Sequence, residues 1–345
     1  MSTNPLHATT KTNIRPKTRH FIQAILFIVT LSLGARFYLY VQQAAGTGPI
    51  TISRPAGVEG FLPIGALLAW KRFFVSGQWD FIHPAAMVIF GFAMSLSLVF
   101  RKAFCSWLCP IGTLSEWVWK FGKRLFGRTF SLPLWLDRAL RTLKYLLLGF
   151  FLWVIGSMSV GAISMFIEGA YYKVSDVKML RFFTHMSTTT AIVLTILTLG
   201  SFFIKNFWCR YLCPYGALTG LLGAAGPTRI VRNDESCIHC KKCTEVCPHY
   251  IRVHEQSAVY TPECSGCMDC VDSCPVEKTM ALRTGISGKF KDWSSRSLGI
   301  VISVSFVTTI TLAIYFGYWD THLSEQEFRR LLQMIESPLL THPTF

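Results

Sequence analysis

Charged residues are scarce in this sequence, and acidic residues are the scarcest of them. Only 15% of the 345 residues are charged, with 19 Asp and Glu against 34 Lys and Arg, whereas 51% are hydrophobic. Soluble domains carry roughly 25% charged residues, so the composition excludes an ordinary soluble globular protein. In a soluble protein the net charge of +15 would suggest nucleic-acid binding. Here we expect basic loops beside a membrane, and no nucleic-acid partner.

Cysteine is absent outside four short clusters. The twelve cysteines occupy positions 105 and 109, 209 and 213, 237 to 247, and 264 to 274. The first twenty residues are polar and carry no cleavable secretory signal, which argues against a secreted disulfide framework. No C-x2-C pair is followed by His, which excludes covalent haem attachment. Metal ligation is therefore the leading use of these cysteines.

Long apolar segments predict an all-α polytopic membrane protein with about five transmembrane helices, since a bilayer core of about 30 Å requires roughly 20 helical residues. The stretch at 61–75 is apolar but short, and its Pro63, Gly65, Lys71 and Arg72 predict an interfacial or re-entrant piece. The predicted spans are 21–41, 83–100, 144–167, 187–204 and 298–318.

Lys and Arg are distributed unevenly between the two sets of loops. The first set has four in 1–20, nine in 101–144 and twelve in 205–297, whereas 42–82 and 168–186 have three each and 319–345 has two. The side that keeps the basic residues is normally the cytoplasm. We therefore expect a multi-pass protein of the bacterial inner membrane, with the N-terminus and all four cysteine clusters in the cytoplasm and the C-terminus in the periplasm.

Two runs of four cysteines have the spacing of a bacterial-type double ferredoxin. Residues 237–248 read CIHCKKCTEVCP and residues 264–275 read CSGCMDCVDSCP, each a C-x2-C-x2-C-x3-C-P motif. In such proteins the fourth Cys of each run ligates the cluster of the other run, and a zinc ribbon would need only two CxxC pairs. The rule assigns Cys237, Cys240, Cys243 and Cys274 to [4Fe-4S] cluster 1, and Cys264, Cys267, Cys270 and Cys247 to [4Fe-4S] cluster 2.

A shorter cysteine motif occurs twice, as FCSWLCPIG at 104–112 and WCRYLCPYG at 208–216. Both copies follow predicted spans on the same side of the membrane, so a pseudo-symmetric arrangement could bring them together. A spacing of four would place the two cysteines of each copy on one helix face. Three interpretations stay open: a third iron-sulfur cluster, a redox-active dithiol relay, or buried structural thiols. The residues concerned are Cys105, Cys109, Cys209 and Cys213.

Protonatable side chains gather in the outer loop 168–186 and at the start of the second predicted span. A quinol site requires an apolar slot with a proton acceptor beside it, and these residues are candidates for it. Ordinary aromatic-belt residues would have the same composition, and two of the histidines could instead ligate a haem, His83 and His185. The quinol candidates are Glu168, Tyr171, Tyr172, His185 and His83.

The sequence therefore predicts membrane helices with an inserted α+β ferredoxin module of the bacterial 2[4Fe-4S] type. In the C-terminal tail, Phe328, Leu331, Leu332 and Ile335 have helical spacing and predict an amphipathic helix with a structural role. The expected parts are a cytoplasmic tail at 1–20, a membrane domain at 21–204 with the first CxxxCP motif at 105–110, a connector with the second motif at 205–227, a ferredoxin domain at 228–290, a last transmembrane helix at 298–318 and a periplasmic tail at 319–345.

Paired CxxxCP motifs followed by a double ferredoxin motif resemble the membrane polyferredoxins of the NapH, NosR and CcoG kind. The resemblance extends over most of the chain beyond residue 40, including VEGFLPIGALL at 58–68 and DVKMLRFFTHM at 176–186. It implies an integral electron-transfer protein that passes single electrons between the quinone pool, its expected substrate, and an unidentified redox protein. Two other functions stay open: a cytoplasmic-facing metal-ion reductase that uses the CxxxCP cysteines, and a non-catalytic assembly or interaction subunit of a redox complex.

Overall fold

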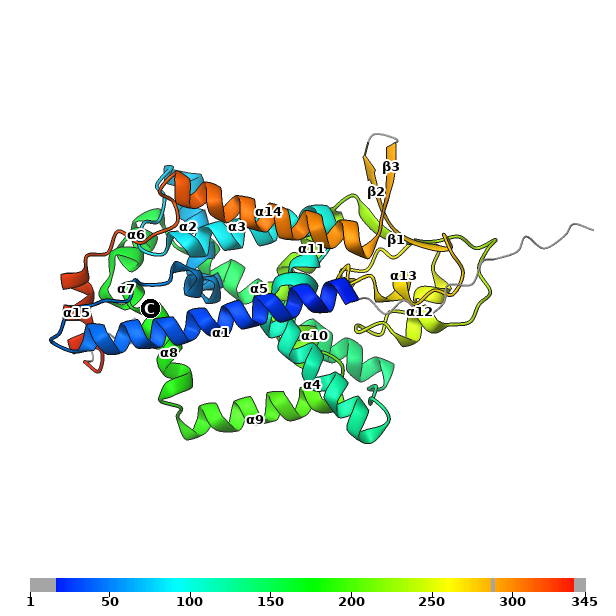
Figure 1. Ribbon diagram of the computed structural model, residues 1–345, viewed down its shortest axis with the longest axis horizontal. Helices are drawn as coiled ribbons and strands as arrows, with labels where there is room; N and C mark the ends of the chain where they lie inside the picture. Colours follow the sequence, from blue (N-terminus) through cyan, green and yellow to red (C-terminus); the bar gives the residue numbers. More distant parts are fainter. Residues whose placement is uncertain (1–16, 287–288, 338–345) are drawn as a thin grey trace, which may run out of the picture. The chain divides into compact units, whose positions relative to one another are not determined.

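A computed structural model describes residues 17–286 and 289–337, and it is mostly helical (Figure 1). The chain forms two compact units, each assembled from three separate stretches of sequence. Unit 1 contains Met1–Leu26, Met94–Tyr145 and Thr198–Val304, and so holds every cysteine. Unit 2 contains Phe27–Ala93, Leu146–Leu197 and Ser305–Phe345.

Three helices are long and apolar enough to cross a membrane: α1 (Lys17–Ala45), α5 (Leu134–Ser157) and α14 (Ser295–Tyr315). A fourth candidate is the pair α8 (Ser175–Thr184) and α9 (Thr188–Phe203), which is bent by 78°. The apolar helix α3 (Pro84–Phe100) has 17 residues, fewer than a full span requires. The chain is thus a membrane protein by helix length and composition, and the count of five spans stays a prediction.

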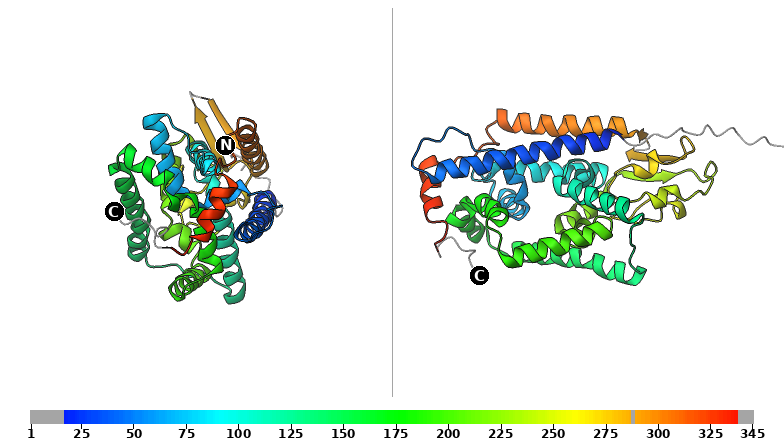
Figure 2. Two further views of the ribbon diagram at one scale, coloured as in Figure 1. Left: turned by 90° about the vertical axis from the view of Figure 1, so that its left-hand side faces the viewer. Right: turned by 60° about the horizontal axis from the view of Figure 1, so that its bottom comes forward.

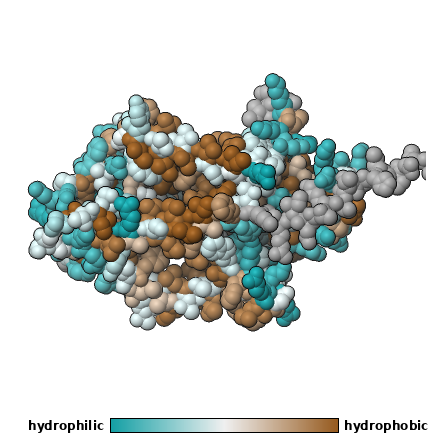
Figure 3. All heavy atoms as spheres, viewed as in Figure 1, coloured by the Kyte–Doolittle hydropathy of each residue, from teal (hydrophilic) through white to brown (hydrophobic). Residues whose placement is uncertain are grey.

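The surface of these helices fits an apolar environment. Along α14 the exposed side chains include Ile300, Val304, Val307 and Leu312, which give the hydrophobic surface visible in Figure 3. In unit 1 the first turns of α14 and α1 lie side by side (Figure 2). A Cβ on Gly299 would meet Ile22 Cδ1 at 2.9 Å, so glycine permits this close approach.

The predicted span at 144–167 is not one helix. α5 begins earlier, at Leu134, and ends at Ser157, and α6 (Val160–Glu168) follows after a break. Ser159 caps the new helix, because its hydroxyl accepts a hydrogen bond from the Ala162 N–H at 3.2 Å. On the other side of the break, Lys71 Nζ donates to the carbonyls of Ile155, Gly156 and Met158 at 2.6–2.9 Å, which satisfies the end of α5.

The other short elements of unit 2 pack around this break and around the C-terminal helix. The segment predicted as interfacial at 61–75 forms α2 (Pro63–Ser76), which packs on α6. α7 (Ala170–Lys173) connects α6 to α8. The tail forms α15 (Glu325–Gln333), and its apolar side chains pack against Phe37, Tyr40 and Val177 of the same unit. The buried residues of this tail are Phe328, Leu331, Leu332 and Ile335.

In unit 1, residues 228–293 form a small α+β module. Its antiparallel sheet has the order β1-β2-β3, with β1 (Thr228–Arg232), β2 (Met280–Ile286) and β3 (Lys289–Trp293). Both cysteine runs lie between β1 and β2, each with one short helix, α12 (Lys242–Glu245) and α13 (Asp269–Asp272). The sheet extends past residue 290, where the ferredoxin domain was expected to end.

Candidate iron-sulfur sites

Two cavities in the ferredoxin module each collect four cysteines. The empty space within the lining, including the part open to solvent, is about 350 Å³ in the first and about 370 Å³ in the second. In each cavity the fourth Cys of one run lies with the first three of the other run, which is the grouping that swapped ligation requires. The first cavity is lined by Cys247, Cys264, Cys267 and Cys270, and the second by Cys237, Cys240, Cys243 and Cys274.

The two runs fold alike because the backbone turns into the left-handed region at matching places. Lys241 and Met268, each directly after the second Cys of its run, have φ of 60° and 65° and precede α12 and α13. His239 and Gly266, each directly before the second Cys, have φ of 53° and 62°. Such conformations are uncommon outside glycine. At Gly266 the absence of a side chain is also needed, since a Cβ there would meet the Phe100 carbonyl oxygen at 2.9 Å.

The donor set of each cavity fits a cubane cluster. Within residues 17–286 and 289–337, no three His, Cys, Asp or Glu side chains lie close enough to ligate a single metal ion. A cubane distributes its four thiolate ligands over four iron corners, so its ligands surround a volume and do not converge on one point. Each cavity offers four cysteines, and apolar side chains such as Val253, Val259 and Met268 complete the first wall.

The sequence predicted that the two cysteines of each CxxxCP motif lie on one face of a helix, and the structure differs in both motifs. Phe104–Leu108 forms one π-helical turn, Cys109 is extended, and Pro110 begins α4 (Pro110–Phe126). In the second copy Cys209 lies in α10 (Phe207–Tyr211) and Cys213 caps α11 (Pro214–Ala225), its sulfur accepting from the Gly216 N–H at 3.3 Å. Proline at the first helical position explains both breaks, because it starts a helix readily but cannot continue one.

The two CxxxCP motifs lie against each other within unit 1. Cys105 Sγ lies 3.5 Å from the hydroxyl of Thr219, which follows the second motif. The rings of Phe104 and Tyr215 pack edge to face at 6.0 Å. Burial raises the pKa of Cys209 well above its usual value, and the nearby sulfurs of Cys109 and Cys105 raise it further. The four sulfurs of the two copies therefore share one environment.

Burial disfavours one of the three interpretations of these four cysteines. It raises the pKa of Cys109 to about 12 and that of Cys213 to about 11, and neighbouring sulfurs add to both shifts. Reactive dithiols depend on a lowered thiol pKa, so this environment disfavours a dithiol relay. As thiols these groups would be inert at neutral pH, and a bound metal is what would deprotonate them.

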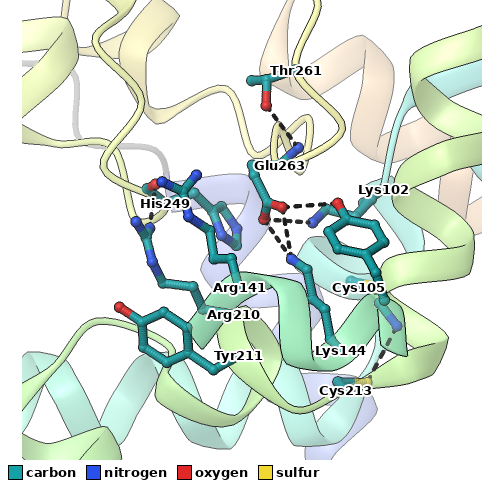
Figure 4. Close-up of polar contacts among 12 residues, drawn as sticks. Lys102, Cys105, Arg141, Lys144, Arg210, Tyr211, Cys213, His249, Thr261 and Glu263 are labelled. Carbon is teal, nitrogen blue, oxygen red and sulfur yellow. Dashed lines mark hydrogen bonds and ion pairs between the residues drawn. The ribbon is translucent and has the colours of Figure 1, made fainter. Parts of the chain in front are cut away.

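Buried positive charge surrounds the CxxxCP sulfurs. Lys144 Nζ contacts both carboxylate oxygens of Glu263 at 2.6 and 2.8 Å, and Lys102 Nζ lies 3.7 Å from the same carboxylate (Figure 4). Burial raises the pKa of Glu263, but the two ammonium groups outweigh burial and hold the pKa well below its usual range. Two lysines thus share one carboxylate beside Cys105 and Cys213 (Figure 4), an excess that favours anionic ligands.

Hydrogen bonds join the first CxxxCP turn to the loop that holds Cys264 and Cys267. Ser106 Oγ donates to the Ser265 carbonyl at 2.8 Å, and Trp107 Nε1 donates to the Gly266 carbonyl at 3.1 Å. Trp107 is fully buried. The first CxxxCP site is therefore in direct contact with the backbone of the buried ferredoxin site.

A buried arginine strengthens this junction from a third direction. Arg19, in the first turn of α1, contacts the Glu116 carboxylate at 2.6 and 2.8 Å and the Asp269 carboxylate at 2.9 and 3.0 Å. Burial raises the pKa of Glu116, but Arg19 and Lys120 outweigh it and hold this pKa well below its usual range. Sequence reasoning missed Arg19 and Glu263; the available signals were a charge directly before a predicted membrane span and a charge directly before a cluster cysteine.

The structure brings together only part of the predicted quinol set. His83 and Tyr172 are buried in unit 2, with His83 Nε2 2.8 Å from the Tyr172 carbonyl oxygen. Glu168 and His185 are exposed, and Tyr171 is partly buried.

Sequence reasoning missed the carboxylates beside this pair. Glu59 Oε1 lies 3.2 Å from His83 Nδ1, and the Tyr172 hydroxyl donates to Asp80 Oδ2 at 2.6 Å. Arg54 pairs with Asp176 at 2.6 Å and lies 3.7 Å from Glu59. No local motif marks these residues, because they come from separate loops.

Comparisons with known proteins agree with the motifs. A family model described as a 4Fe-4S binding domain matches residues 82–129 and 186–232, one match for each CxxxCP copy, and a model described as a 4Fe-4S dicluster domain matches residues 229–275. The chain is 41% identical over 328 residues to "Putative electron transport protein YccM" of Escherichia coli (strain K12), covering 94% of this chain and 91% of YccM.

More distant relatives share part of the chain. An uncharacterized protein of Methanocaldococcus jannaschii is 29% identical, over 59% of this chain and 80% of its own length. The ferredoxin-type protein NapH of Escherichia coli (strain K12) is 25% identical, over 55% of this chain and 66% of NapH. No solved structure gives a significant match.

Proposed function

Because the chain belongs to the NapH/NosR-type family of 4Fe-4S polyferredoxins, we propose that it passes single electrons between the quinone pool and a redox protein through three iron-sulfur clusters. The observation that carries this proposal is the pair of hydrogen bonds from Ser106 and Trp107 to the loop of the buried ferredoxin site. These bonds connect the duplicated CxxxCP site to the ferredoxin module without an intervening segment.

The cysteines of unit 1 would hold the three clusters, which supply one-electron redox chemistry when bound. The buried lysines beside the CxxxCP sulfurs would balance the negative charge of the thiolates. The proposed ligand sets are Cys105, Cys109, Cys209 and Cys213 for the third cluster, Cys247, Cys264, Cys267 and Cys270 for cluster 2, and Cys237, Cys240, Cys243 and Cys274 for cluster 1.

The exposure of the cysteines supports an order in which electrons would pass between the three sites. All four proposed ligands of cluster 2 are buried: Cys247, Cys264, Cys267 and Cys270. In the cluster 1 set Cys240 is exposed and the other three cysteines are partly exposed. The proposed order is the CxxxCP site, then cluster 2, then cluster 1, where a soluble redox protein would exchange electrons.

In unit 2 the buried Glu59 and His83 pair is the proposed proton acceptor for quinol. Oxidation of a quinol to a quinone releases two electrons and two protons, so a site needs a base that is shielded from bulk solvent. Burial raises the pKa of the Glu59 carboxyl, which makes it a better base than an exposed carboxylate. Glu168 and His185, both exposed, are less suited to this role and stay as peripheral candidates with Tyr171.

The proposed orientation places the ferredoxin module on the cytoplasmic side of the bacterial inner membrane, following the distribution of Lys and Arg. A reporter enzyme that is active only in the periplasm, fused after Phe345, should be active. Activity of the same reporter fused near residue 290, with silence at Phe345, would contradict this orientation.

The test of function uses iron-loaded, full-length protein in lipid nanodiscs. A quinol should reduce the clusters, followed by electron paramagnetic resonance, and Glu59→Gln should slow this reduction by roughly a hundredfold or more. Reduction by dithionite should be unchanged in the variant, which separates proton chemistry from cluster loss. Clusters that dithionite reduces but no quinol reduces would contradict the quinone part of the proposal and favour an assembly role.

A further inference from the structure

The hairpin of β2 and β3 extends out of the ferredoxin module, beside the start of the membrane helix α14. β3 is the edge strand of the sheet and pairs only with β2. Its first four residues, Lys289 to Asp292, are exposed. Trp293 ends the strand, and α14 begins two residues later, at Ser295. An exposed edge strand normally needs a cover, a charge or a partner.

The two faces of β3 differ in charge. Lys289, Lys291 and Trp293 alternate onto one face, and the Lys291 ammonium lies 4.1 Å from the centre of the Trp293 ring. On the opposite face Asp292 pairs with Arg283 at 2.7 Å, so this face is neutral. Among the described residues no carboxylate pairs with Lys289 or Lys291. The Trp293 face therefore carries the uncompensated positive charge.

The contacts of Trp293 show which way the Trp293 face of β3 points. Its ring packs edge to face, at 5.0 Å, on Phe100, the last residue of the apolar helix α3. Its Nε1 donates to the Thr284 hydroxyl at 2.9 Å, which fixes the indole orientation. The strands run across the axis of α14 near its first turn (Figure 1), so they extend sideways from the end of the helix. The lysines on the Trp293 face thus point to the level where α3 ends and α14 begins.

We propose that this face of the hairpin, Lys289, Lys291 and Trp293, lies on the membrane leaflet and binds the headgroups of anionic phospholipids. Tryptophan prefers the bilayer interface, and lysine stems extend along apolar surface while the ammonium reaches the headgroups. One basic residue near an anionic surface contributes roughly fivefold to binding, so two should contribute roughly thirty-fold. The contact would hold the hairpin against the membrane and shield β3 from bulk solvent.

Hydrogen exchange tests this proposal on iron-loaded, full-length protein. We would compare nanodiscs of phosphatidylglycerol mixed with phosphatidylcholine against nanodiscs of phosphatidylcholine alone. The outward-facing amides of β3 have no strand partner, so they should exchange slowly only where lipid covers them. We expect slower exchange of residues 289–293 with phosphatidylglycerol, and loss of this protection in Lys289→Gln/Lys291→Gln.

Two variants separate a lipid contact from a general charge effect. Arg252→Gln/Lys278→Gln removes the same charge from two exposed residues of the module that line neither cavity, and it should keep the protection. Lys289→Arg/Lys291→Arg keeps the charge and should also keep the protection from exchange. In native mass spectrometry the Gln pair at β3 should lower the preference for phosphatidylglycerol by up to roughly thirty-fold.

If the Lys289→Gln/Lys291→Gln variant fails to load iron, the salt dependence of the wild-type protection gives an independent test. Raising the salt from about 0.1 M to 1 M shortens the Debye length from about 10 Å to about 3 Å, so the wild-type protection should disappear. Equal exchange of β3 in both lipids, or an equal loss of protection in the Arg252/Lys278 control, would overturn the proposal. Neither readout depends on electron transfer, so failure of the proposed function leaves this test intact.

Discussion

The two ferredoxin motifs have the same spacing, yet they form different environments. Around the cluster 2 cavity the four cysteines are buried, and Ile230, Ile251 and Val253 close the walls. Around the cluster 1 cavity Cys240 is exposed, and Ile238 has 60% of its surface exposed. The comparison teaches that spacing specifies ligands, whereas packing against the CxxxCP turns decides which site is internal.

The charges around the two sites differ as well. The ionisable side chains that line the cluster 1 cavity, apart from the cysteines, are all basic: Arg232, His239, Lys241, Lys242 and His254. The cluster 2 cavity has only His249, which is buried, and burial together with Lys102 lowers the pKa of His249 well below its usual value. A neutral imidazole and apolar walls thus surround the internal site, and a basic rim surrounds the outer one.

The largest expected effect comes from the cysteine that each run contributes to the other. Cys247→Ala should damage the buried site and Cys274→Ala the exposed site, each with a loss of about four irons, because the fourth Cys crosses over. Iron analysis and electron paramagnetic resonance would measure this. The spectrum left in Cys274→Ala should equal that of Cys240→Ala, and a match with Cys267→Ala would show that ligation is not swapped.

Changing the CxxxCP cysteines tests what lies next to the buried site. We expect about twelve irons per chain in the wild type, four for each of three clusters, and about eight after Cys109→Ala, with the ferredoxin signals retained. Cys105, Cys209 and Cys213 should behave in the same way as Cys109 when changed to Ala. About eight irons in the wild type and no loss in the variants would instead support structural thiols or a dithiol.

Glu263→Gln should destabilise the protein near the buried cluster 2 site. Removing one partner of a buried ion pair costs about 3–5 kcal/mol, and here it would leave Lys102 and Lys144 without their shared carboxylate. The thermal midpoint of unfolding in detergent would fall. Glu245→Gln, an exposed carboxylate near the cluster 1 cavity, is the matched control and should change the midpoint little. Equal midpoints for the two variants would mean that the network contributes nothing.

The smallest expected effect is that of Trp107→Phe. It removes one hydrogen bond and leaves the buried Gly266 carbonyl unpaired, a cost of about 1–3 kcal/mol. Iron content should stay at the wild-type value, while electron transfer from the CxxxCP site to the ferredoxin module should slow. Trp135→Phe, at an exposed position, serves as the control. Unchanged transfer kinetics after flash reduction would argue against this contact as the route.

Sequence reasoning predicted the family and the membrane class well because each depends on local spacing or composition, and the cysteine ligand sets stay a prediction. It placed a single span at 144–167, where the structure has a break at residues 158 and 159, because hydropathy averages over the cap at Ser159 and the carbonyls that Lys71 binds. It also placed each CxxxCP pair on one helix face, because a spacing of four alone takes no account of proline at the start of the next helix.

The sequence by itself determined which residues are chemically able to hold clusters, since thiol ligands and their spacing are covalent properties of the chain. Only the tertiary structure decided which cysteines share a cavity, which site is buried, and which charges surround them. Arg19 meets Asp269 across 250 residues, and Glu263 meets Lys144 across 119. Such pairs form because buried charges need partners, and no local pattern in the sequence says where the chain will bring those partners together.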